Sequence, residues 1–202
     1  MKKLSREFYS RDTETVAKEL LGKILIHEVD GKRFSGKIVE TEAYLGIKDK
    51  AAHSYGGRRT PRVEVMYGKA GFSYVFIIYG MYYCFNVVTQ KEEIPEAVLV
   101  RALEPIENLD IIANNRFKKD YNDLTKTQIK SLTNGPGKLC DALRINKTLN
   151  GEDLCDNRLY IVDNDEEFNI ITDKRIGIDY AEEARDYLLR FYIENNKYVS
   201  VK

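Results

Sequence analysis

Two carboxylates and a phenol alternate along the segment Glu-Thr-Glu-Ala-Tyr, at Glu40, Glu42 and Tyr44. If this segment is a β-strand, its two-residue period places these three side chains on one face and the smaller neighbours on the other. Paired carboxylates can act as general acids and bases. They can also form a solvated polar face opposite an apolar one, and the pattern alone favours this simpler interpretation.

A histidine and a basic loop follow this segment closely. His53 lies nine residues after Tyr44 and is followed by Ser-Tyr-Gly-Gly-Arg-Arg-Thr-Pro-Arg. Residues 53–75 contain four basic residues and one acidic residue, a net charge of +3. A basic face of this kind can attract a polyanion such as nucleic acid. Ordinary solvated surface explains the charge equally well.

These motifs predict neither a metal site nor a covalent nucleophile. A catalytic zinc ion takes three protein ligands, and Glu42 and His53 would need a third from distant sequence, without HxxxH or CxxC spacing to supply it. No serine or cysteine lies in a GxSxG context, and Cys84 lies in an apolar aromatic segment where a buried packing role is expected. We therefore expect chemistry without a metal ion or cofactor.

Large side chains occupy a predicted turn at residues 79–82. Residues 72–88 are the most β-prone stretch of the chain, and Gly80 divides them into two runs, which predicts a tight hairpin. Turns are usually built from small polar residues. Tyr79, Met81 and Tyr82 at this tip suit insertion between bases, as in proteins that extract a nucleotide from duplex DNA. The residue types alone slightly favour packing of Tyr79 and Tyr82 into the core instead.

Length and composition predict one globular domain over residues 1–202. The chain has 202 residues, 43% hydrophobic, with only four prolines, enough to bury roughly 70% of the unfolded surface. Disorder and collagen-like repeats are excluded. Three cysteines form no even disulfide framework, which predicts a reducing, cytoplasmic location. The N-terminus lacks the apolar core of a signal peptide, and no apolar run approaches the roughly 20 residues of a membrane span.

The net charge of zero hides an uneven distribution. The 32 Lys and Arg residues balance 32 Asp and Glu residues, and a neutral total is evidence against a nucleic-acid partner. Residues 152–183, however, contain eleven acidic and three basic residues, a net charge of −8, which leaves +8 on the rest of the chain. A local basic face is therefore compatible with the composition.

The predicted elements favour an α+β architecture. Strand and helix patterns do not alternate regularly, which favours a mainly antiparallel sheet over a doubly wound parallel one. Asp12 can cap a helix that runs to Leu21, with Gly22 as a left-handed stop, and Asp30-Gly31 suits a type I′ turn between β-rich flanks. The other expected elements are the hairpin at 72–88, helices near 107–117, after Gly137 and around 179–188, and strands in LRFYI and KYVSV.

Seven ordered segments link these elements to a known family. They are LLGK (20–23), VETEAYLG (39–46), AAHSYGGRRTPR (51–62), YVFIIYGMYYCFNV (74–87), VLVRALEP (98–105), NGPGKLCDALRINK (134–147) and LRFY (189–192). Together they resemble the alkyladenine DNA glycosylases, also called 3-methyladenine DNA glycosylases of the mammalian type. With the element pattern, this resemblance implies a single compact α+β domain with a curved, mainly antiparallel β-sheet, surrounding helices and a protruding β-hairpin.

The resemblance implies a hydrolytic role for Glu42. It would be the general base that takes a proton from a water attacking the sugar C1′ while the damaged base leaves. A glutamate is ordinarily ionised at neutral pH and can also stabilise the positive charge on an oxocarbenium-like sugar. Arg101 would help to hold the water, and the backbone carbonyl of Ile176 would supply another contact. Arg101 as a structural ion-pair partner of Glu42 is an alternative compatible with that role.

By the same resemblance, a stacking pocket would hold the extruded base. Tyr44 and His53 match two of its walls, and Phe76 stands where well-known relatives have a tyrosine, which keeps a stacking face but removes a hydroxyl. Electron-poor, positively charged alkylpurines should stack best on such rings. Asn86 would reject normal guanine by crowding its 2-amino group, although an asparagine in a strand can equally be a structural hydrogen-bonding residue.

The resemblance further implies that the partner is double-stranded DNA containing damaged purines. Tyr79 matches the intercalating residue, with Met81 and Tyr82 beside it, and Lys138 and Lys147 match phosphate-contacting lysines. The substrates would include 3-methyladenine, 7-methylguanine, hypoxanthine and ethenoadenine. No lysine occupies a nucleophile position, so the enzyme would leave an abasic site without cutting the strand. We expect a cytoplasmic monomer, associated with the nucleoid if the source is bacterial, without a membrane partner.

Two other functional classes stay open. A non-catalytic module could bind damaged DNA with the same tyrosine wedge and pocket, although Glu42 and Arg101 together argue against it. An RNA-binding or formyltransferase-associated domain of related architecture would need no base at position 42. Release of a modified purine from DNA separates all three classes.

Overall fold

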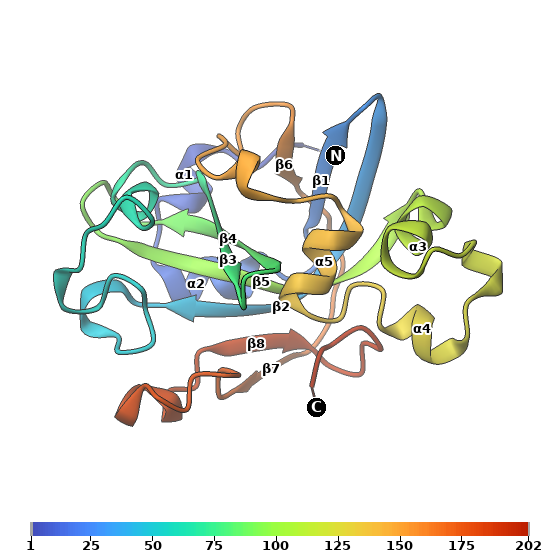
Figure 1. Ribbon diagram of the computed structural model, residues 1–202. Coiled ribbons are helices and arrows are strands. Elements are labelled where there is room, and N and C mark those ends of the chain that lie inside the picture. Colours follow the sequence, from blue (N-terminus) through green and yellow to red (C-terminus); the bar gives the residue numbers. More distant parts are fainter. Residues whose placement is uncertain (1, 202) are drawn as a thin grey trace.

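The computed structural model describes residues 2–201, which form an eight-stranded antiparallel sheet with short helices around it (Figure 1). The strands are β1 (Ile24–Val29), β2 (Lys32–Tyr44), β3 (Ser73–Ile78), β4 (Tyr82–Thr89), β5 (Glu96–Glu107), β6 (Leu159–Val162), β7 (Ile170–Asp173) and β8 (Arg190–Ile193). The α-helices are α1 (Arg6–Tyr9), α2 (Thr13–Glu19), α3 (Leu109–Phe117), α4 (Lys126–Lys130) and α5 (Pro136–Ala142). The 3-10 helices are η1 (Gly46–Lys48), η2 (Tyr55–Gly57), η3 (Glu64–Tyr67), η4 (Tyr121–Asp123), η5 (Lys147–Leu149) and η6 (Glu182–Asp186). The predicted α+β class is confirmed.

The long strand β2 is the centre of the sheet. The strand order is β3-β4-β5-β2-β1-β6, and β8 pairs with both β2 and β7. The first half of β2 pairs with β1, while Glu40, Thr41 and Glu42 pair with β8. Register irregularities between β2 and β5 flank Glu40, and β-bulges of this kind bend a strand and redirect its side chains. Two sequence-distant strands therefore meet β2 where its carboxylates lie.

Both predicted hairpins are confirmed. Asp30 and Gly31 have φ angles of 52° and 68°, and Tyr79 and Gly80 have φ angles of 53° and 70°. Two consecutive positive φ angles are those of a type I′ turn, whose twist matches that of the flanking strands. Asp and Gly adopt this conformation readily, whereas a tyrosine does so at a steric cost.

The predicted N-terminal helix is confirmed, with its end two residues earlier than expected. The Asp12 side chain accepts a hydrogen bond from the Thr15 N–H, which caps α2. Val16 and Ala17 are fully buried, and Gly22 follows with a φ angle of 80°. α3 and α5 form where helices were expected, near 107–117 and after Gly137. Helix α5 begins two residues earlier than expected, at Pro136.

Two C-terminal expectations are wrong. Residues 179–188 contain only the short 3-10 helix η6, because Glu182 has a φ angle of 49°, which a right-handed α-helix does not accommodate. Ala181 and Ala184 are buried in a cluster with Ala51 and Ile178. LRFYI contains β8, but KYVSV is not a strand. The Ser200 N–H there bonds to the Glu40 side chain instead of a neighbouring strand.

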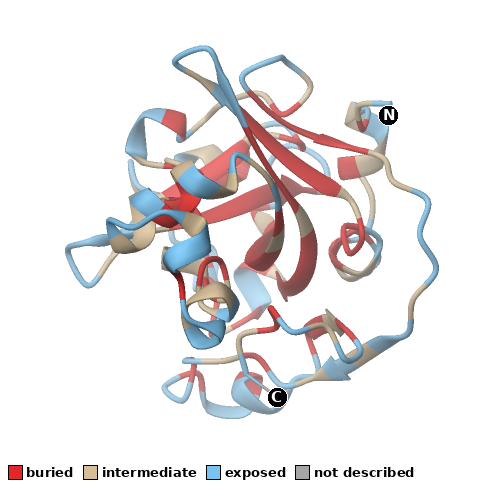
Figure 2. Cartoon of the chain, turned by 90° about the vertical axis from the view of Figure 1, so that its right-hand side faces the viewer, coloured by how far each residue is buried: buried red, intermediate tan, exposed pale blue. Residues whose placement is uncertain are grey.

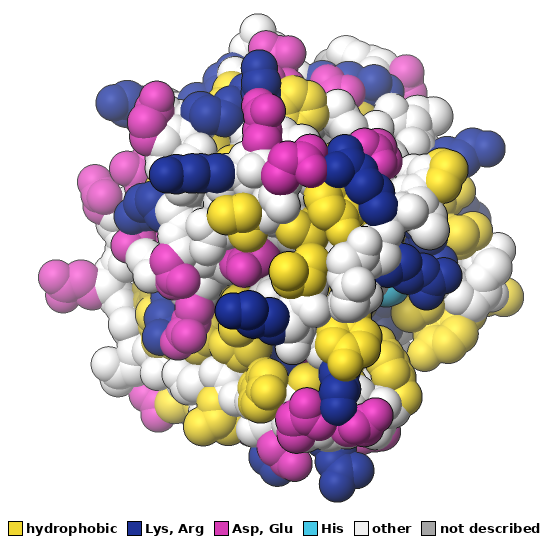
Figure 3. Space-filling model, turned by 90° about the vertical axis from the view of Figure 1, so that its left-hand side faces the viewer, with side chains coloured by type: hydrophobic (Ala, Val, Ile, Leu, Met, Phe, Trp, Pro, Cys, Tyr) yellow, Lys and Arg dark blue, Asp and Glu magenta, His cyan; other side chains and the backbone are white. Residues whose placement is uncertain are grey.

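Buried side chains concentrate in the strands and exposed ones in the surrounding loops (Figure 2). α2 contacts β2, and α5 contacts β4. The largest fully buried side chains include Tyr9, Phe34, Phe85, Phe191, Leu20 and Leu103. Of the helices within residues 2–201, none has the length and apolarity needed to cross a membrane. Basic and acidic side chains are interspersed on the face shown in Figure 3, with hydrophobic side chains exposed among them.

Candidate active site

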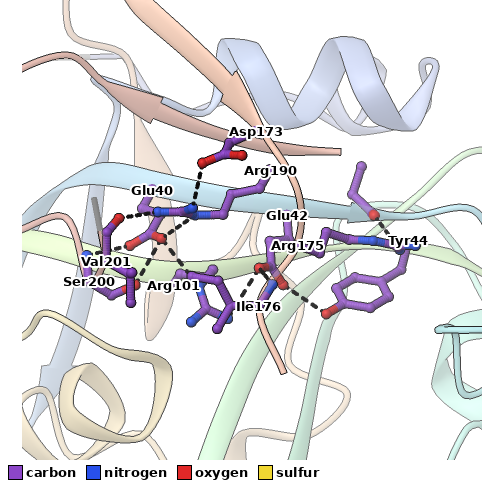
Figure 4. Close-up of polar contacts among 11 residues, drawn as sticks. Glu40, Glu42, Tyr44, Arg101, Asp173, Arg175, Ile176, Arg190, Ser200 and Val201 are labelled. Atoms are coloured by element: carbon purple, nitrogen blue, oxygen red, sulfur yellow. Dashed lines mark hydrogen bonds and ion pairs between the residues drawn. The ribbon is translucent and has the colours of Figure 1, made fainter. Parts of the chain in front are cut away.

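Glu42 lies in a buried polar network that contains residues from three regions of the chain (Figure 4). Its side chain is fully buried. The Tyr44 hydroxyl donates to Oε2 at 2.8 Å and the Ile176 N–H donates to Oε1 at 2.8 Å, while Arg101 Nη1 lies 3.3 Å from Oε1. A carboxylate has about four acceptor positions. Three are used here, so one position remains for a further donor such as water.

Glu40 is equally buried, and the solvated-face interpretation of this strand is therefore wrong. Arg190 Nε donates to Glu40 Oε1 at 2.8 Å, and Arg101 Nε lies 3.4 Å from the same oxygen. Ser200 donates to Glu40 through its N–H and its hydroxyl. Strand β8 and the C-terminal segment cover this face of β2, and the guanidinium groups of Arg190 on β8 and Arg101 on β5 lie beside the buried carboxylates as counter-charges.

A cavity of about 140 Å³ lies in front of this network. An apolar cavity of about 150 Å³ is sufficient for benzene. The lining of the cavity in this protein combines aromatic and apolar walls with a few polar atoms. The sequence-predicted residues Tyr44, His53, Phe76, Asn86, Arg101 and Ile176 all line it. These come from β2, the loop after η1, the strands β3, β4 and β5, and the segment after β7. Glu42 lies behind Tyr44, Arg101 and Ile176, which it contacts.

His53 and Phe76 form one corner of the cavity. Their ring centroids are 4.6 Å apart at an interplanar angle of 72°. The His53 Nδ1 atom lies 2.8 Å from the Tyr74 hydroxyl. Burial, together with the charges of Arg62 and Arg58, lowers the pKa of His53 to about 4. His53 is therefore a neutral ring at physiological pH.

The remaining polar residues of the cavity are held by hydrogen bonds or burial. The Asn86 side-chain amide donates to the Tyr74 carbonyl at 3.0 Å, so it has a structural hydrogen bond as well as a position on the cavity wall. Burial, more than the adjacent Glu42 carboxylate, raises the pKa of Tyr44 well above its usual range, which keeps its hydroxyl a donor. Cys84 is buried, as expected, and burial raises its pKa to about 11.

The hairpin tip is solvent-exposed, and the alternative that its tyrosines pack into the core is wrong for Tyr79. Tyr79 is 83% exposed, Met81 65% and Tyr82 42%. Tyr82 packs over Gly137 of α5, where a Cβ atom would lie only 3.0 Å from Tyr82 Cβ. Gly137 thus permits the close approach of the hairpin to α5.

The expected phosphate-contacting lysines lie apart from the cavity lining. Lys138 Nζ donates to the Asn134 side chain at 2.8 Å, and burial lowers its pKa. Lys147 begins η5 at the surface. Arg59 pairs with Glu64 and Glu93 at 2.7 Å each, whereas no carboxylate of residues 2–201 lies within 4.0 Å of Arg58 or Arg62. The Arg62 guanidinium lies 5.1 Å from the Phe76 ring centroid.

Sequence reasoning missed several residues of this site. Tyr180 and Ile178 line the cavity, and Tyr74 bonds to His53. Arg175 and Asp49 form a buried ion pair behind Tyr44 although they are 126 positions apart. No spacing rule connects such distant residues. The hydrogen bond from the Ile176 N–H to Glu42 was not expected either; the water contact expected for the Ile176 carbonyl stays a prediction.

Comparisons with known proteins agree on one family. The family model described as "Methylpurine-DNA glycosylase (MPG)" matches residues 7–197. A protein of Desulfitobacterium hafniense (strain Y51), named "Putative 3-methyladenine DNA glycosylase", is 66% identical over 203 residues and the match covers both chains fully. Proteins with the same name in Clostridium novyi and Clostridium acetobutylicum are 63% and 64% identical, over 100% and 98% of each chain. All three relatives are bacterial, so the mammalian-type label is not established by them.

Proposed function

We propose a specific reaction on the premise that this chain belongs to the methylpurine-DNA glycosylase family and is a DNA glycosylase, an enzyme of DNA repair. In this reaction the enzyme excises alkylated or deaminated purines from duplex DNA by hydrolysing the N-glycosidic bond. The substrates are 3-methyladenine, which the names of the bacterial relatives specify, and the related bases 7-methylguanine, hypoxanthine and ethenoadenine. The observation that carries this proposal is the buried Glu42 carboxylate behind a cavity of about 140 Å³ with aromatic walls.

In the proposed step, a water held at the free acceptor position of Glu42 attacks C1′ of the extruded nucleotide. The water oxygen bonds to C1′ as the C1′–N bond breaks, the water proton passes to Glu42, and the bond's electron pair leaves with the base. Arg101 fixes one Glu42 oxygen from β5, and the Ile176 N–H fixes it from the C-terminal segment. The carboxylate also stabilises positive charge that develops on the sugar. The product is an abasic site in an uncut strand.

The proposed base pocket uses stacking for affinity and Asn86 for selectivity. Tyr44, His53 and Phe76 provide ring faces, and a neutral His53 avoids repulsion of a positively charged alkylpurine. Asn86 would crowd the 2-amino group of normal guanine. In 7-methylguanine, which keeps that group, the positive charge of the methylated ring would offset the crowding by stronger stacking. Since Phe76 lacks a hydroxyl, the wall it forms stacks without donating a hydrogen bond, which favours cationic bases over neutral ones that depend on polar contacts.

We further propose that residues 1–202 act as one monomeric glycosylase domain in the cytoplasm, on nucleoid DNA. Tyr79 would enter the base stack left by the extruded nucleotide, with Met81 and Tyr82 beside it, and Lys138 and Lys147 would contact phosphates. The exposure of the hairpin tip supports this arrangement. The alternative is a non-catalytic module that binds damaged DNA. A non-catalytic module would not require two buried carboxylates, Glu40 and Glu42, paired with the one guanidinium of Arg101. Burying these charges costs free energy of desolvation.

The test is release of a modified purine from a duplex that contains one 3-methyladenine, hypoxanthine or ethenoadenine, followed by alkali to cleave abasic sites. Wild-type protein should yield breaks, and Glu42→Gln should lower the rate constant at least a hundredfold, on the order of other catalytic-base losses, while it still binds the duplex. Glu28→Gln is the matched control, since Glu28 also accepts a tyrosine hydroxyl bond, from Tyr160 at 2.6 Å, outside the cavity. Binding without any breaks would favour the non-catalytic module.

A further inference from the structure

A buried ion pair between Arg175 and Asp49 lies behind the base cavity without lining it. The Arg175 side chain is 0% exposed and that of Asp49 1%. Arg175 Nη1 and Nη2 donate to the two Asp49 oxygens at 2.5 and 2.9 Å. The carboxylate also accepts the N–H groups of Leu45 and Ala51 at 3.0 Å each. Asp49 is thus fully hydrogen-bonded, and it fixes the guanidinium in one orientation.

Arg175 contacts strand β2 at the Ala43 carbonyl and at the Tyr44 ring. Its Nη1 atom donates to the Ala43 carbonyl at 2.9 Å, and Ala43 lies between Glu42 and Tyr44 in the strand. The guanidinium also lies 4.7 Å from the Tyr44 ring centroid, and Tyr44 is a wall of the cavity. Nη2 donates to the Ala184 carbonyl at 3.1 Å. One side chain therefore joins β2, the Tyr44 ring and the segment around η6.

The next residue along the chain, Ile176, donates its N–H to Glu42 Oε1. Gly177 follows with a φ angle of 75°, so the backbone after Ile176 adopts a conformation that glycine makes readily accessible. Without an anchor on its other side, this segment could move away from Glu42. The Arg175 side chain is that anchor, because Asp49 holds it in place and Arg175 directly precedes Ile176, whose N–H is the donor to Glu42.

We propose that Arg175 and Asp49 are a positioning pair that presents the Ile176 N–H to Glu42 and supports the Tyr44 ring from behind. This inference rests on the proposed function of Glu42. The pair neither lines the cavity nor contacts the Glu42 carboxylate directly. Its effect on Glu42 is therefore transmitted through Ile176 and Tyr44, which do contact that carboxylate. Its effect falls on the chemical step, where small displacements of a catalytic group are costly, and not on binding of DNA at the exposed hairpin.

The charged and titratable groups around Glu42 come from four elements. They are Tyr44 and Glu40 on β2, Cys84 on β4, Arg101 on β5 and Arg175 after β7. Loss of the Ile176 hydrogen bond removes one of the contacts that fix the orientation of the Glu42 carboxylate, and leaves Arg101 alone at Oε1. The chemical step should therefore slow in a variant of the positioning pair.

The experiment compares Arg175→Lys and Asp49→Asn with wild type by single-turnover excision. A lysine keeps the positive charge but loses the two-pronged contact, and an asparagine keeps the shape of Asp49 but loses its charge. We expect the excision rate constant to fall by about tenfold to a hundredfold. The affinity for a duplex with a non-cleavable abasic analogue should change by less than about twofold. If Arg175→Lys fails to fold, Asp49→Asn decides the question.

Arg6→Lys is the matched control. Arg6 also pairs with an aspartate, Asp153, donates to a backbone carbonyl, that of Ala70, and lies over an aromatic ring, that of Phe72, but none of these residues lines the cavity. Arg6→Lys should lower thermal stability without slowing excision by the folded protein. Rates equal to wild type in the Arg175 and Asp49 variants, or losses that only match their unfolded fraction, would overturn the positioning role. A wild-type protein that releases no purine would instead overturn the proposed function.

Discussion

The two histidines of this chain are both kept neutral by burial, yet only one lies at the cavity. Burial lowers the pKa of His27 and, together with Arg62 and Arg58, that of His53 to about 4. Desolvation disfavours the charged imidazolium, and two nearby guanidinium groups add repulsion at His53. Protonating His53 in the folded protein therefore costs free energy, and the imidazole stays neutral where it would stack on a purine.

This environment predicts a pH dependence of stability. In the unfolded chain His53 regains its ordinary pKa of 6.5, so between about 4 and 6.5 the unfolded state binds a proton that the folded state does not. The free energy of unfolding should fall as the pH decreases through this window. His53→Gln should make that decrease shallower in urea unfolding measured from pH 4.5 to 7. His27 is unchanged in this variant and keeps its own contribution to the pH dependence of stability. An unchanged slope would therefore contradict a contribution from His53.

The resemblance to the family revealed much of the cavity but not the contacts that hold its residues in place. Tyr44, His53 and Asn86 could be proposed from the seven family-like segments, and the structure places all three around one cavity. The burial of Glu40 and Glu42 was not predictable, because alternation tells which residues share a face and not what covers it. Here β8 and the C-terminal segment cover it, with Arg190 as the counter-charge. That cover comes from residues about 150 positions away.

At the scale of elements, strong local signals were read correctly and weak ones were not. The hairpins β1–β2 and β3–β4 carry turn residues and long β-prone flanks, so their local preferences agree with the fold. The strands β6 and β7 have four residues each and were not predicted. Their pairing depends on partners far along the chain, β1 and β8. KYVSV has a strand composition, but its backbone bonds to a side chain.

The tip of hairpin β3–β4 combines backbone strain with exposure. Tyr79 occupies a turn position with a φ angle of 53° that favours Asn or Gly, and its ring is 83% exposed. Tyr79→Asn should leave the free energy of unfolding unchanged or raise it by up to about 1 kcal/mol. It should also slow excision from duplex DNA by about tenfold, because no ring fills the gap in the base stack. Urea unfolding and single-turnover excision measure the two effects.

The first hairpin supplies the control for this prediction. Asp30 occupies the equivalent turn position with a φ angle of 52°, and Asp30→Asn should change neither stability nor excision appreciably. A Tyr79→Asn protein that excises as fast as wild type would show that the tip does not enter the duplex. A less stable one would show that the tyrosine ring contributes packing that its exposure does not reveal.

At the scale of the molecule, many charges are paired within the fold, whereas two arginines beside the cavity, Arg58 and Arg62, have no carboxylate of residues 2–201 within 4.0 Å. Within the acidic block 152–183, Glu166 pairs with Lys37 and Asp153 with Arg6, and both Glu182 and Glu183 with Lys50. The connection from β6 to β7, which carries part of the block, passes behind the sheet in the view of Figure 1. We infer that DNA approaches from the hairpin side, where Arg58 and Arg62 are exposed.

The salt dependence of DNA binding should distinguish these arginines. Each phosphate contact adds about 0.9 to the slope of log K against log salt concentration, so Arg58→Gln and Arg62→Gln should each lower its magnitude by up to about that amount. Arg59→Gln, between them, should change it less, because Glu64 and Glu93 already neutralise Arg59. Replacing Glu166 and Glu167 by glutamine should leave the slope unchanged if the acidic block lies away from the duplex. Equal slopes for the three arginine variants would mean that Arg58 and Arg62 do not contact phosphate groups of the DNA more than Arg59 does.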